Sequence, residues 1–468
     1  MTVTFYNTRT RTKEDFIPLQ DGKAGIYSCG PTVYHHAHIG NMRSYVFADL
    51  LRRVMEHAGY EVKHVMNITD VGHLVSDDDE GEDKMEVGKK REGLDAWGVA
   101  EKYTESFFDH CHKLNILPPH IVCKATEHIE QQIALIQTLE DRGLAYVIED
   151  GVYFDTSKFK AYGAMAKLDI EGLEGGKRIS DIGKKHKTDF ALWKFSPTDS
   201  QRDMEWDSPW GKGFPGWHVE CSAMSMHYLG EQFDIHTGGI DHIPIHHTNE
   251  IAQSEAATGK KPFVNVWLHN EFLQFGDDVK MSKSKGDTLT VDSLEDKGYD
   301  PLAFRYLMLT AHYRNPVKFT WDALDGAAAA LKRLRKNALE IKHNTESCPA
   351  EDISETAALY ITRFDTALFD DLNSAVALAE LHNMLGDAKL DDFEKMALLM
   401  YFEPVLHLGL FEEQETAAIP ADIIEMAHQR KTARDARNWP EADRLRAEIA
   451  KQGFDVMDND DGFEVFKK

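Results

Sequence analysis

The sequence predicts an α/β fold: a doubly wound parallel sheet of the Rossmann type, interrupted by a mixed insertion and followed by a helical bundle and a small C-terminal domain. Three observations lead to this prediction. A strand, helix, strand pattern covers residues 26–68, short apolar runs resume after residue 189, and the chain beyond residue 300 has helical periodicity. At 468 residues, 42% of them hydrophobic, the chain is too long for one core and can bury several.

The first strand, helix, strand unit is built around residues 26–43, which read IYSCGPTVYHHAHIGNMR. An apolar run ends at Cys29, a turn follows, and apolar residues then recur at helical spacing from Met42 to Met55. Gly40 stands at the helix entrance, where a ligand can approach the backbone and where free N–H groups and the helix dipole favour phosphate. His38 is expected to donate to phosphate oxygens from either ring nitrogen.

Helices are predicted over residues 94–115, in the first half of the domain, and 127–144, in the insertion. An Asp-Gly turn between β-rich arms predicts a hairpin over 146–156, and a stretch rich in Gly, Lys and Asp predicts a loop over 163–187. The parallel sheet is then expected to resume. Its predicted elements are strands at 190–195, 216–221, 233–236 and 264–269 and a helix at 245–258.

Four helices are predicted after residue 300, with Ala-rich faces typical of a bundle, at residues 303–311, 321–342, 354–385 and 392–408. A segment rich in Glu and Ala at 412–420 separates them from a last small unit. The expected division is a Rossmann domain in two halves (1–120 and 205–275) around a connective insertion (121–204). A loop region (276–320), a bundle (321–410) and a C-terminal unit (411–468) follow.

Composition excludes several classes of protein. No uncharged apolar run approaches 18 residues and the first residues contain no apolar signal core, which predicts a protein without a membrane span or an export signal. Five scattered cysteines favour free thiols or metal ligands in a reducing cytoplasm. A net charge of −26 argues against indiscriminate nucleic-acid binding, so a nucleic-acid partner must meet local basic patches. The acidic run at 77–83 lacks the spacing of a calcium loop and is expected to be solvated.

A metal site is the first candidate for chemistry. Cys29 and Cys221 are each expected to end a strand, and His246 and Glu250 lie four residues apart on one face of a predicted helix. Two thiolates, an imidazole and a carboxylate suit tetrahedral zinc. The same four residues could also have ordinary structural roles, as two buried cysteines, a core histidine and a surface glutamate. Residue spacing alone therefore leaves both the metal site and this alternative open.

The second candidate is the segment KMSKSKG at residues 280–286, on a loop between 274–278 and 288–290. Lysines interleaved with hydroxyl groups and a nearby glycine form a flexible cationic arm. Such an arm can fold over a polyphosphate, and an ordinary solvated turn is the alternative.

KMSKS at 280–284 together with HIG at 38–40 resembles the paired signature of class I aminoacyl-tRNA synthetases. The whole chain is similar to the cysteinyl-tRNA synthetase family. The segments that carry this resemblance are CGPTVY (29–34), NITD (67–70), GWHVECSAM (216–224), FDIHTGG (233–239), HHTNEIAQSEA (246–256) and the basic region 433–446. Two positions depart from the family: Asn41 replaces the second histidine of the signature, and VGH follows NITD where many members carry acidic residues. Asparagine still donates a hydrogen bond, so ATP binding is expected to survive.

The resemblance implies roles for individual residues. It implies zinc ligation by Cys29, Cys221, His246 and Glu250, the set that ligand chemistry also suggests. It implies catalytic roles for His38, Lys280 and Lys283. It further implies ATP contacts from His38, Gly40, Asn41, Lys280, Ser282 and Lys283, and substrate contacts from Thr69, Trp217, His236 and Asp241.

The activity implied is that of a cytoplasmic, monomeric cysteine–tRNA ligase with one Zn²⁺ per chain, which uses ATP with Mg²⁺ to activate L-cysteine and transfers it to tRNA(Cys). Anticodon binding is implied for the C-terminal unit. Its basic residues alternate with acidic residues. The alternative to anticodon binding is therefore a pair of helices whose basic side chains form salt bridges within the unit. These cations are Arg430, Lys431, Arg434, Arg437, Arg444, Arg446 and Lys451.

Three rival functions remain from the sequence. A cysteine ligase that joins activated cysteine to an amino sugar could use the same core, but such a small acceptor needs neither a bundle nor a basic C-terminal unit. A zinc-stabilised RNA-binding protein without catalysis would leave KMSKS unexplained. A zinc hydrolase needs an open metal position, which four protein ligands do not provide.

Overall fold

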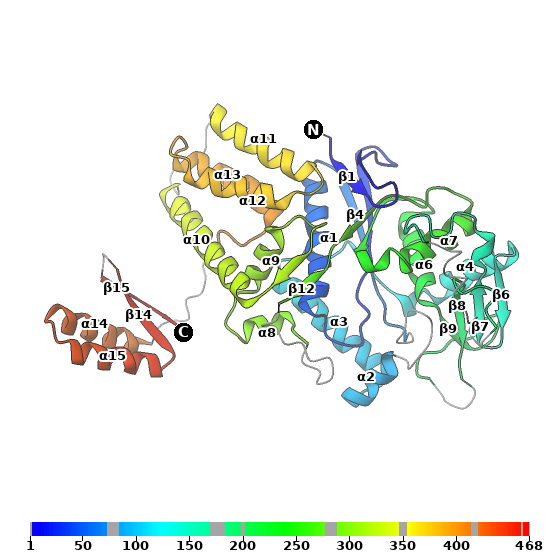
Figure 1. The fold of residues 1–468 in the computed structure, drawn as a ribbon, viewed down its shortest axis with the longest axis horizontal. Helices are drawn as coiled ribbons and strands as arrows, with labels where there is room; N and C mark the ends of the chain where they lie inside the picture. The colour runs from blue at the N-terminus through cyan, green and yellow to red at the C-terminus, as the bar shows by residue number, and fades with distance from the viewer. Residues whose placement is uncertain are drawn as a thin grey trace. The chain divides into compact units, whose positions relative to one another are not determined.

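The computed structural model of the chain describes residues 2–72, 84–168, 183–197, 202–276, 288–345, 353–412, 420–459 and 462–467. The chain divides into two compact units, Met1–Leu410 and Phe411–Lys468, each described here by itself (Figure 1). None of the helices in the described residues is both long enough and apolar enough to cross a bilayer.

A five-stranded parallel sheet forms the centre of the first unit, in the order β11-β10-β3-β4-β5. Its strands are β3 (Lys23–Ser28), β4 (Glu61–Ile68), β5 (Ile121–Lys124), β10 (Phe233–Gly239) and β11 (Val264–Asn270). The predicted doubly wound α/β fold is confirmed. From β3 the chain winds outward in one direction and from β10 in the other, so a topological switch point lies between these two strands, where ligands bind in such sheets.

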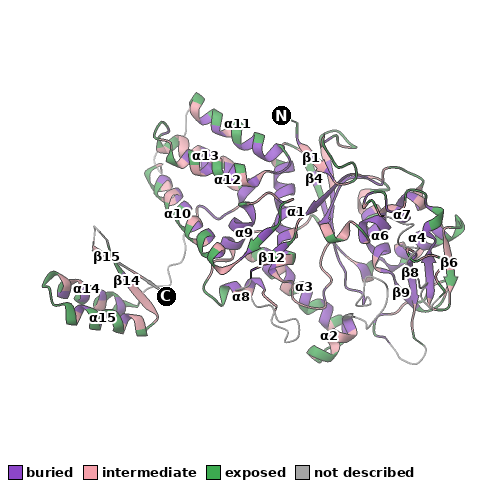
Figure 2. Ribbon diagram, viewed as in Figure 1, coloured by how far each residue is buried: buried purple, intermediate pink, exposed green. Residues whose placement is uncertain are grey.

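Helix α1 (Ile39–His57) connects β3 to β4 and is buried along most of its length (Figure 2). It begins as predicted, at the His-Ile-Gly element, and Gly59 follows its end with φ 91°, a left-handed conformation that suits glycine. Helices α2 (Lys84–Glu92) and α3 (Ala96–Lys113) follow β4. A two-stranded pair, β1 (Thr4–Asn7) with β2 (Thr12–Asp15), precedes β3.

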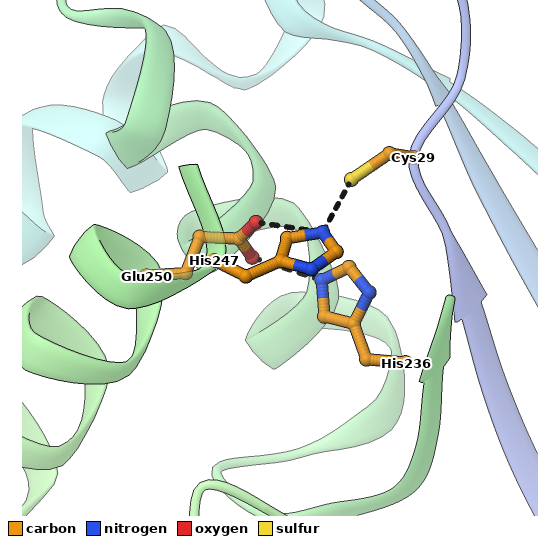
Figure 3. A group of neighbouring side chains, drawn as sticks. All are labelled: Cys29, His236, His247 and Glu250. Carbon is orange, nitrogen blue, oxygen red and sulfur yellow. Dashed lines mark hydrogen bonds and ion pairs between the residues drawn. The ribbon is translucent and has the colours of Figure 1, made fainter. Parts of the chain in front are cut away.

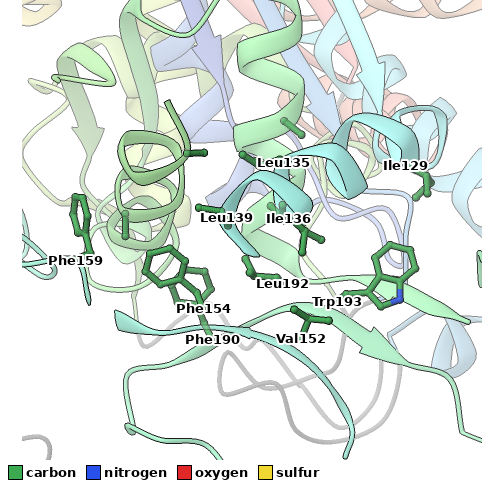
Figure 4. Close-up of a cluster of buried hydrophobic side chains, with 14 residues drawn as sticks. Ile129, Leu135, Ile136, Leu139, Val152, Phe154, Phe159, Phe190, Leu192 and Trp193 are labelled. Atoms are coloured by element: carbon green, nitrogen blue, oxygen red, sulfur yellow. The ribbon is translucent and has the colours of Figure 1, made fainter. Parts of the chain in front are cut away.

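The insertion is an antiparallel sheet in the order β6-β7-β8-β9, with helix α4 (Ile129–Asp141) packed beside it (Figure 1). The strands are β6 (Ala145–Ile148), β7 (Gly151–Phe154), β8 (Phe190–Phe195) and β9 (Gly213–Pro215). The predicted hairpin is confirmed as β6 and β7, but it turns at Glu149-Asp150, because Gly151 already pairs with Ile148 as the first residue of β7. Leu135, Leu139, Phe154 and Leu192 belong to its buried core, shown in Figure 4.

Two predictions about the resumed sheet are wrong. The run at 190–195 is β8 of the antiparallel insertion, and 216–221 is not a strand, because helix α6 spans Trp217–Leu229. In α6 the consecutive residues 218–225 are all buried, so no polar face reveals the 3.6-residue period that marks a helix. Helix α7 (His246–Thr258) packs beside α6 and connects β10 to β11.

The helical part of the first unit contains a parallel strand pair, β12 (Leu273–Phe275) with β13 (Val317–Phe319), which encloses its first two helices in the chain. Its helices are α8 (Val291–Glu295), α9 (Pro301–Leu309), α10 (Trp321–Thr345), α11 (Glu355–Phe369), α12 (Ser374–Gly386) and α13 (Asp392–Leu406). The single helix predicted over 354–385 is two helices. Asp371 and Leu372 between them have φ 64° and 57°, and the Asp371 carboxylate accepts hydrogen bonds from Tyr6 N and Tyr313 Oη. These tertiary contacts override the local helical pattern.

The second unit is a helix pair with a β-hairpin: α14 (Ala421–Asp435), α15 (Trp439–Lys451), β14 (Phe454–Asn459) and β15 (Gly462–Lys467). Ile423, Ala427, Ile449 and Val456 form its small buried core. The Arg430 guanidinium donates to both carboxylate oxygens of Asp458 at 2.8 and 3.0 Å, which ties α14 to the hairpin.

Candidate metal centre and active site

The four predicted metal ligands converge at the switch point of the central sheet. Cys29 directly follows β3, Cys221 lies in the second turn of α6, and His246 and Glu250 lie one turn apart at the start of α7. One ligand atom from each lies within 4.8 Å of those of the other three. Cys29 is half-buried, and the other three are buried. Residues from both halves of the interrupted sheet therefore contribute to one cluster.

The spacing of the donor atoms fits a cation. His246 Nε2 and Glu250 Oε1 lie 3.0 Å apart, although Glu250 Oε1 has no hydrogen-bond partner within the described part of the chain. Nitrogen and oxygen ligands at about 2.0–2.1 Å from a tetrahedral zinc ion are separated by roughly 3.3 Å. His246 Nδ1 lies 3.0 Å from His218 Nδ1, so Nε2 is the nitrogen that faces the cluster.

Electrostatics also favour positive charge between these side chains. A hydrogen bond to Cys29 lowers the pKa of Cys221 to about 7 although the thiol is buried. Burial disfavours the charged forms of Glu250 and His246, yet His236 and His246 lower the pKa of Glu250 to about 2, and Glu250 and Cys221 raise the pKa of His246 to about 10. His246 thus carries positive charge beside the Glu250 carboxylate and the Cys221 sulfur, and a divalent metal takes this place when it displaces the imidazolium proton.

A second layer of histidines surrounds the cluster. His236 Nε2 lies 3.0 Å from Glu250 Oε2, and His247 Nε2 lies 3.4 Å from Cys29 Sγ (Figure 3). His247 Nδ1 in turn lies 2.7 Å from His269 Nε2, and His269 Nδ1 lies 2.8 Å from Thr8 Oγ1. Burial lowers the pKa of His247 and that of His269 well below the usual value for histidine, so both rings are neutral. Such outer partners orient metal ligands.

A second set of side chains, which the sequence motifs do not indicate, competes for the same metal. Cys29, His236, His247 and Glu250 also place one ligand atom each within 4.8 Å of the others. This set shares Cys29 and Glu250 with the predicted one and replaces Cys221 and His246 by two imidazoles. The dense histidines of 233–247 were the available signal, but their convergence depends on Gly238, where a Cβ atom would lie 2.6 Å from His247 Cε1.

The predicted substrate residues are distributed around this cluster. Trp217 begins α6, and its ring centroid lies 4.5 Å from that of His246. His236 is buried and contacts Glu250, as described above. Asp241 is exposed in a short turn just after β10. Thr69 is buried at the end of β4, and its hydroxyl donates to Glu220 Oε2 at 3.2 Å. Trp217 and His236 thus lie at the cluster, and Thr69 lies beside α6.

The predicted phosphate-binding residues form the N-terminus of α1. His38 Nδ1 accepts a hydrogen bond from Asn41 N at 3.1 Å, and Asn41 Oδ1 accepts one from His38 N at 3.2 Å. This reciprocal cap makes Nδ1 an acceptor, so a neutral His38 carries its hydrogen on Nε2. The expectation that His38 donates from either nitrogen is therefore wrong. A Cβ atom at Gly40 would lie 2.9 Å from the His38 ring. Lys280, Ser282 and Lys283 lie outside the described residues.

Known proteins resemble this chain over its full length. Residues 15–329 match the family model described as the tRNA synthetases class I (C) catalytic domain. The chain is 50% identical to cysteine–tRNA ligase 1 of Burkholderia lata over 467 residues, which cover 100% of this chain and 97% of the relative. It is 41% identical to the cysteine–tRNA ligase of Treponema denticola over 494 residues, with 100% of both chains covered.

Among solved structures, the chain resembles Mycobacterium tuberculosis methionyl-tRNA synthetase bound by methionyl-adenylate, with a TM-score of 0.57. That match has 16% sequence identity and covers 82% of this chain and 88% of the other. At this identity the likeness concerns the fold alone.

Proposed function

This chain belongs to the cysteine–tRNA ligase family of class I tRNA synthetases, and from that premise we propose that it activates L-cysteine with ATP and transfers it to tRNA(Cys). The observation that carries the proposal is the full-length similarity to curated ligases, in a chain whose Cys29, Cys221, His246 and Glu250 meet at the switch point of the sheet. The amino-sugar ligase, the non-catalytic RNA-binding protein and the hydrolase are not favoured.

We propose that one Zn²⁺ is held by Cys29, Cys221, His246 and Glu250. Two sulfur donors, one imidazole and one carboxylate are ligands that zinc accepts. The competing set, in which His236 and His247 replace Cys221 and His246, offers only one sulfur. When bound, Zn²⁺ supplies a soft Lewis acid for which a thiolate is a better ligand than a hydroxyl group. Trp217, His236, Asp241 and Thr69 are proposed to surround the substrate amino acid.

The activation step needs positioning and charge stabilisation rather than a covalent enzyme intermediate. A carboxylate oxygen of cysteine attacks the α-phosphorus of ATP, the bond to the bridging oxygen breaks, and pyrophosphate leaves with Mg²⁺. His38, through its Nε2–H, and the backbone near Gly40 are proposed to hold phosphate oxygens at the N-terminus of α1. Lys280, Ser282 and Lys283 are proposed to close over the same phosphates.

Transfer to tRNA completes the proposed reaction: the terminal ribose hydroxyl attacks the carbonyl carbon of cysteinyl-adenylate, and AMP leaves. We propose that residues 276–320 contact the acceptor stem and that residues 411–468 bind the anticodon. The basic side chains of α14 and α15 support this role, although Arg444 and Lys451 pair with Glu441 and Glu448 in the same helix. We further propose that the enzyme acts as a monomer in the cytoplasm.

Exchange of labelled pyrophosphate into ATP tests the proposal. The expected result is exchange that depends on cysteine and is absent with serine, followed by charging of tRNA(Cys). Cysteine-dependent exchange with an amino-sugar product and no charged tRNA would favour the amino-sugar ligase. Binding of tRNA without any exchange would favour a non-catalytic protein.

Lys283→Ala tests the role of the loop. Because Lys283 is assigned to charge that develops as pyrophosphate departs, the variant should lose exchange activity while equilibrium binding of cysteine stays nearly unchanged. Lys285→Ala, two residues along the same loop, is the matched control and should retain exchange. Equal losses of exchange and of cysteine binding in Lys283→Ala would contradict the assignment.

Selection of cysteine over serine tests the metal. An apolar pocket separates such near-isosteres only by about a hundredfold. The rest of the discrimination is proposed to come from the substrate thiolate, which would join the metal as a fifth ligand beside the four protein ligands. After cobalt replaces zinc, a sulfur-to-cobalt charge-transfer band should grow when cysteine is added and not when serine is added. A metal-free preparation that rejects serine as strongly as the loaded enzyme would refute this use of the metal.

A further inference from the structure

The proposed metal ligands come from two separately supported parts of the fold. Cys221, His246 and Glu250 lie on α6 and α7, which are bound together because Gln253 Nε2 donates to both His218 O and Ser222 Oγ, and Ser254 Oγ donates to Ser222 Oγ. Cys29 lies on the loop after β3. Something must fix the position of its sulfur relative to the α6–α7 pair.

A buried chain of hydrogen bonds joins these two parts. Gly30 N donates to Asn67 Oδ1 at 2.9 Å, Asn67 Nδ2 donates to Thr69 Oγ1 at 3.0 Å, and Thr69 Oγ1 donates to Glu220 Oε2 at 3.2 Å. Its first member is the neighbour of Cys29 in the sequence, and its last member is the neighbour of Cys221. The residues Asn67, Thr69 and Glu220 are at most 1% exposed.

The direction of every link is determined by the groups involved. The Gly30 amide can only donate, so the Asn67 side chain accepts through its oxygen and donates through its nitrogen. The Thr69 hydroxyl has one hydrogen, which it donates to Glu220. The backbone reinforces the first half of the chain: Thr69 N donates to Pro31 O at 3.0 Å, and Val33 N donates to Thr69 O at 3.2 Å. Because no link can be reversed, these groups hold one arrangement.

Close packing makes the arrangement specific. A Cβ atom at Gly30 would lie 1.6 Å from the carbonyl oxygen of Asn67, so only glycine lets the loop of Cys29 approach the end of β4 this closely. The Cys29 backbone is also tied to the other neighbouring strand, since Cys29 N donates to Thr237 O at 3.3 Å.

We propose that Asn67, Thr69 and Glu220 are positioning residues that hold the Cys29 sulfur at the separation from Cys221, His246 and Glu250 that metal binding requires. This inference rests on the proposed function, and specifically on its metal site. It gives the Thr69 hydroxyl a role distinct from substrate contact: loss of a substrate contact raises the KM for cysteine, whereas loss of this bridge weakens metal binding before any substrate is present.

Metal affinity of the full-length chain tests the proposal, measured by competition between the protein and a chelator for Zn²⁺. Thr69→Val keeps the shape of the side chain and removes the bridging hydroxyl, and it should weaken Zn²⁺ binding by about 10-fold, the lower end of the effect of losing a direct outer partner of a metal ligand, because Thr69 acts one residue away from Cys29 and Cys221. Thr69→Ser keeps the hydroxyl and should bind Zn²⁺ nearly as the wild type does. In the cobalt-substituted protein, Thr69→Val should also weaken the sulfur-to-cobalt band, because the Cys29 sulfur leaves its place.

The matched control is Tyr313→Phe, which removes another buried hydroxyl donor to a buried carboxylate, the 2.7 Å bond to Asp371 Oδ1. It should lower stability without changing Zn²⁺ affinity. If Thr69→Val does not fold, Asn67→Ala breaks the same bridge at its other link and carries the same expectation.

Each outcome bears on the inference. Unchanged Zn²⁺ affinity in a folded Thr69→Val variant overturns the positioning role, whether or not its KM for cysteine rises. Equal losses in Thr69→Val and Tyr313→Phe also overturn it, because the effect would then be one of general stability. A wild-type protein that shows cysteine-dependent exchange but binds no Zn²⁺ overturns the metal site, and this inference with it, while leaving the activity in place.

Discussion

Cys29 and Glu250 belong to both groups of side chains that could hold a metal ion, so the remaining two ligands decide the chemistry of the centre. With Cys221 and His246 the metal has two sulfur ligands, and with His236 and His247 it has one. Zinc accepts thiolate ligands readily, so the set with two sulfur atoms is the better zinc site.

Single substitutions separate the two groups. Cys221→Ser should abolish tight Zn²⁺ binding, because a hydroxyl group is a poor replacement for a thiolate. His247→Gln removes only an outer partner of Cys29 and should weaken binding about 10- to 100-fold. Chelator competition measures both affinities. The reverse order of effects would identify His236 and His247 as the ligands.

Asp70 gives a pH dependence away from the metal ligands. Burial raises its pKa to about 6, with Glu220 adding to the shift, although Thr126 N and Oγ1 donate to the carboxylate at 3.0 and 2.6 Å. A carboxyl group whose pKa is raised on folding contributes stability that is complete below about pH 4, near its unfolded pKa, and is lost as the pH rises through about 6.

Asp70→Asn removes this titration with little change in shape. The free energy of unfolding of the wild type minus that of the variant should therefore fall between about pH 4 and about pH 7, by on the order of 3 kcal/mol. Urea denaturation of both proteins across this range measures the difference. A difference that is constant with pH would show that the carboxyl group keeps an ordinary pKa.

At the scale of elements, α1 is joined to the helical part of the chain through a buried charge cluster. Asp49 Oδ2 on α1 accepts hydrogen bonds from Arg53 Nε at 2.8 Å and from Arg305 Nη2 on α9 at 2.6 Å, and Asp49 Oδ1 accepts one from Leu117 N at 2.9 Å. Arg305 Nε donates to Leu406 O at the end of α13 at 2.8 Å. The Arg305 guanidinium therefore joins α9 both to the Asp49 carboxylate of α1 and to the end of α13.

Breaking this cluster should be costly. Arg305→Ala leaves Asp49 buried with one cation fewer and should lower the free energy of unfolding of the first unit by about 3–5 kcal/mol. Lys336→Ala on α10 is the control, because Lys336 and Glu340 form an exposed pair 3.8 Å apart whose loss should cost at most about 1 kcal/mol. Denaturant unfolding measures both, and similar losses would show that the buried cluster contributes no more than a surface pair.

Two glycines show how the same substitution has opposite effects in different elements. Gly326 is exposed within α10, and a Cβ atom there would meet nothing within 4 Å, so Gly326→Ala should stabilise the first unit by about 0.5–1 kcal/mol. Gly30→Ala would place its Cβ atom against the Asn67 carbonyl and should destabilise by more than about 3 kcal/mol. Thermal unfolding distinguishes the two, and a tolerated Gly30→Ala would show that the loop of Cys29 can move away from β4.

At the scale of the whole molecule, the two compact units allow function to be divided. A chain that ends at Leu410 keeps the four proposed metal ligands and the elements that carry them. It lacks α14, α15 and the β14–β15 hairpin. Cysteine-dependent pyrophosphate exchange should persist in this truncated chain, whereas charging of tRNA(Cys) should fall sharply. Persistent exchange also serves as the control for folding. Undiminished charging would show that the second unit is dispensable for tRNA.

Much of this protein was determined by signals within a few residues of the chain. The periodicity of α1, the alternating arms of the β6–β7 hairpin and the one-turn spacing of His246 and Glu250 are local, and a local pattern survives into the folded state when nothing distant opposes it. The signature motifs are local in the same sense, which is why the family and its proposed ligands could be named from the sequence.

Tertiary structure decided what depends on distant parts of the chain. Helix α6 is buried on all sides and so lost the polar face that reveals a helix, and contacts of Asp371 with Tyr6 and Tyr313 ended α11 where the local pattern continues. Cys29 and His247 are 218 residues apart in sequence, yet Cys29 Sγ lies 3.4 Å from His247 Nε2. The sequence could name these side chains, but the order of strands in the sheet brings them together, because pairing between strands, rather than chain proximity, determines which residues become neighbours.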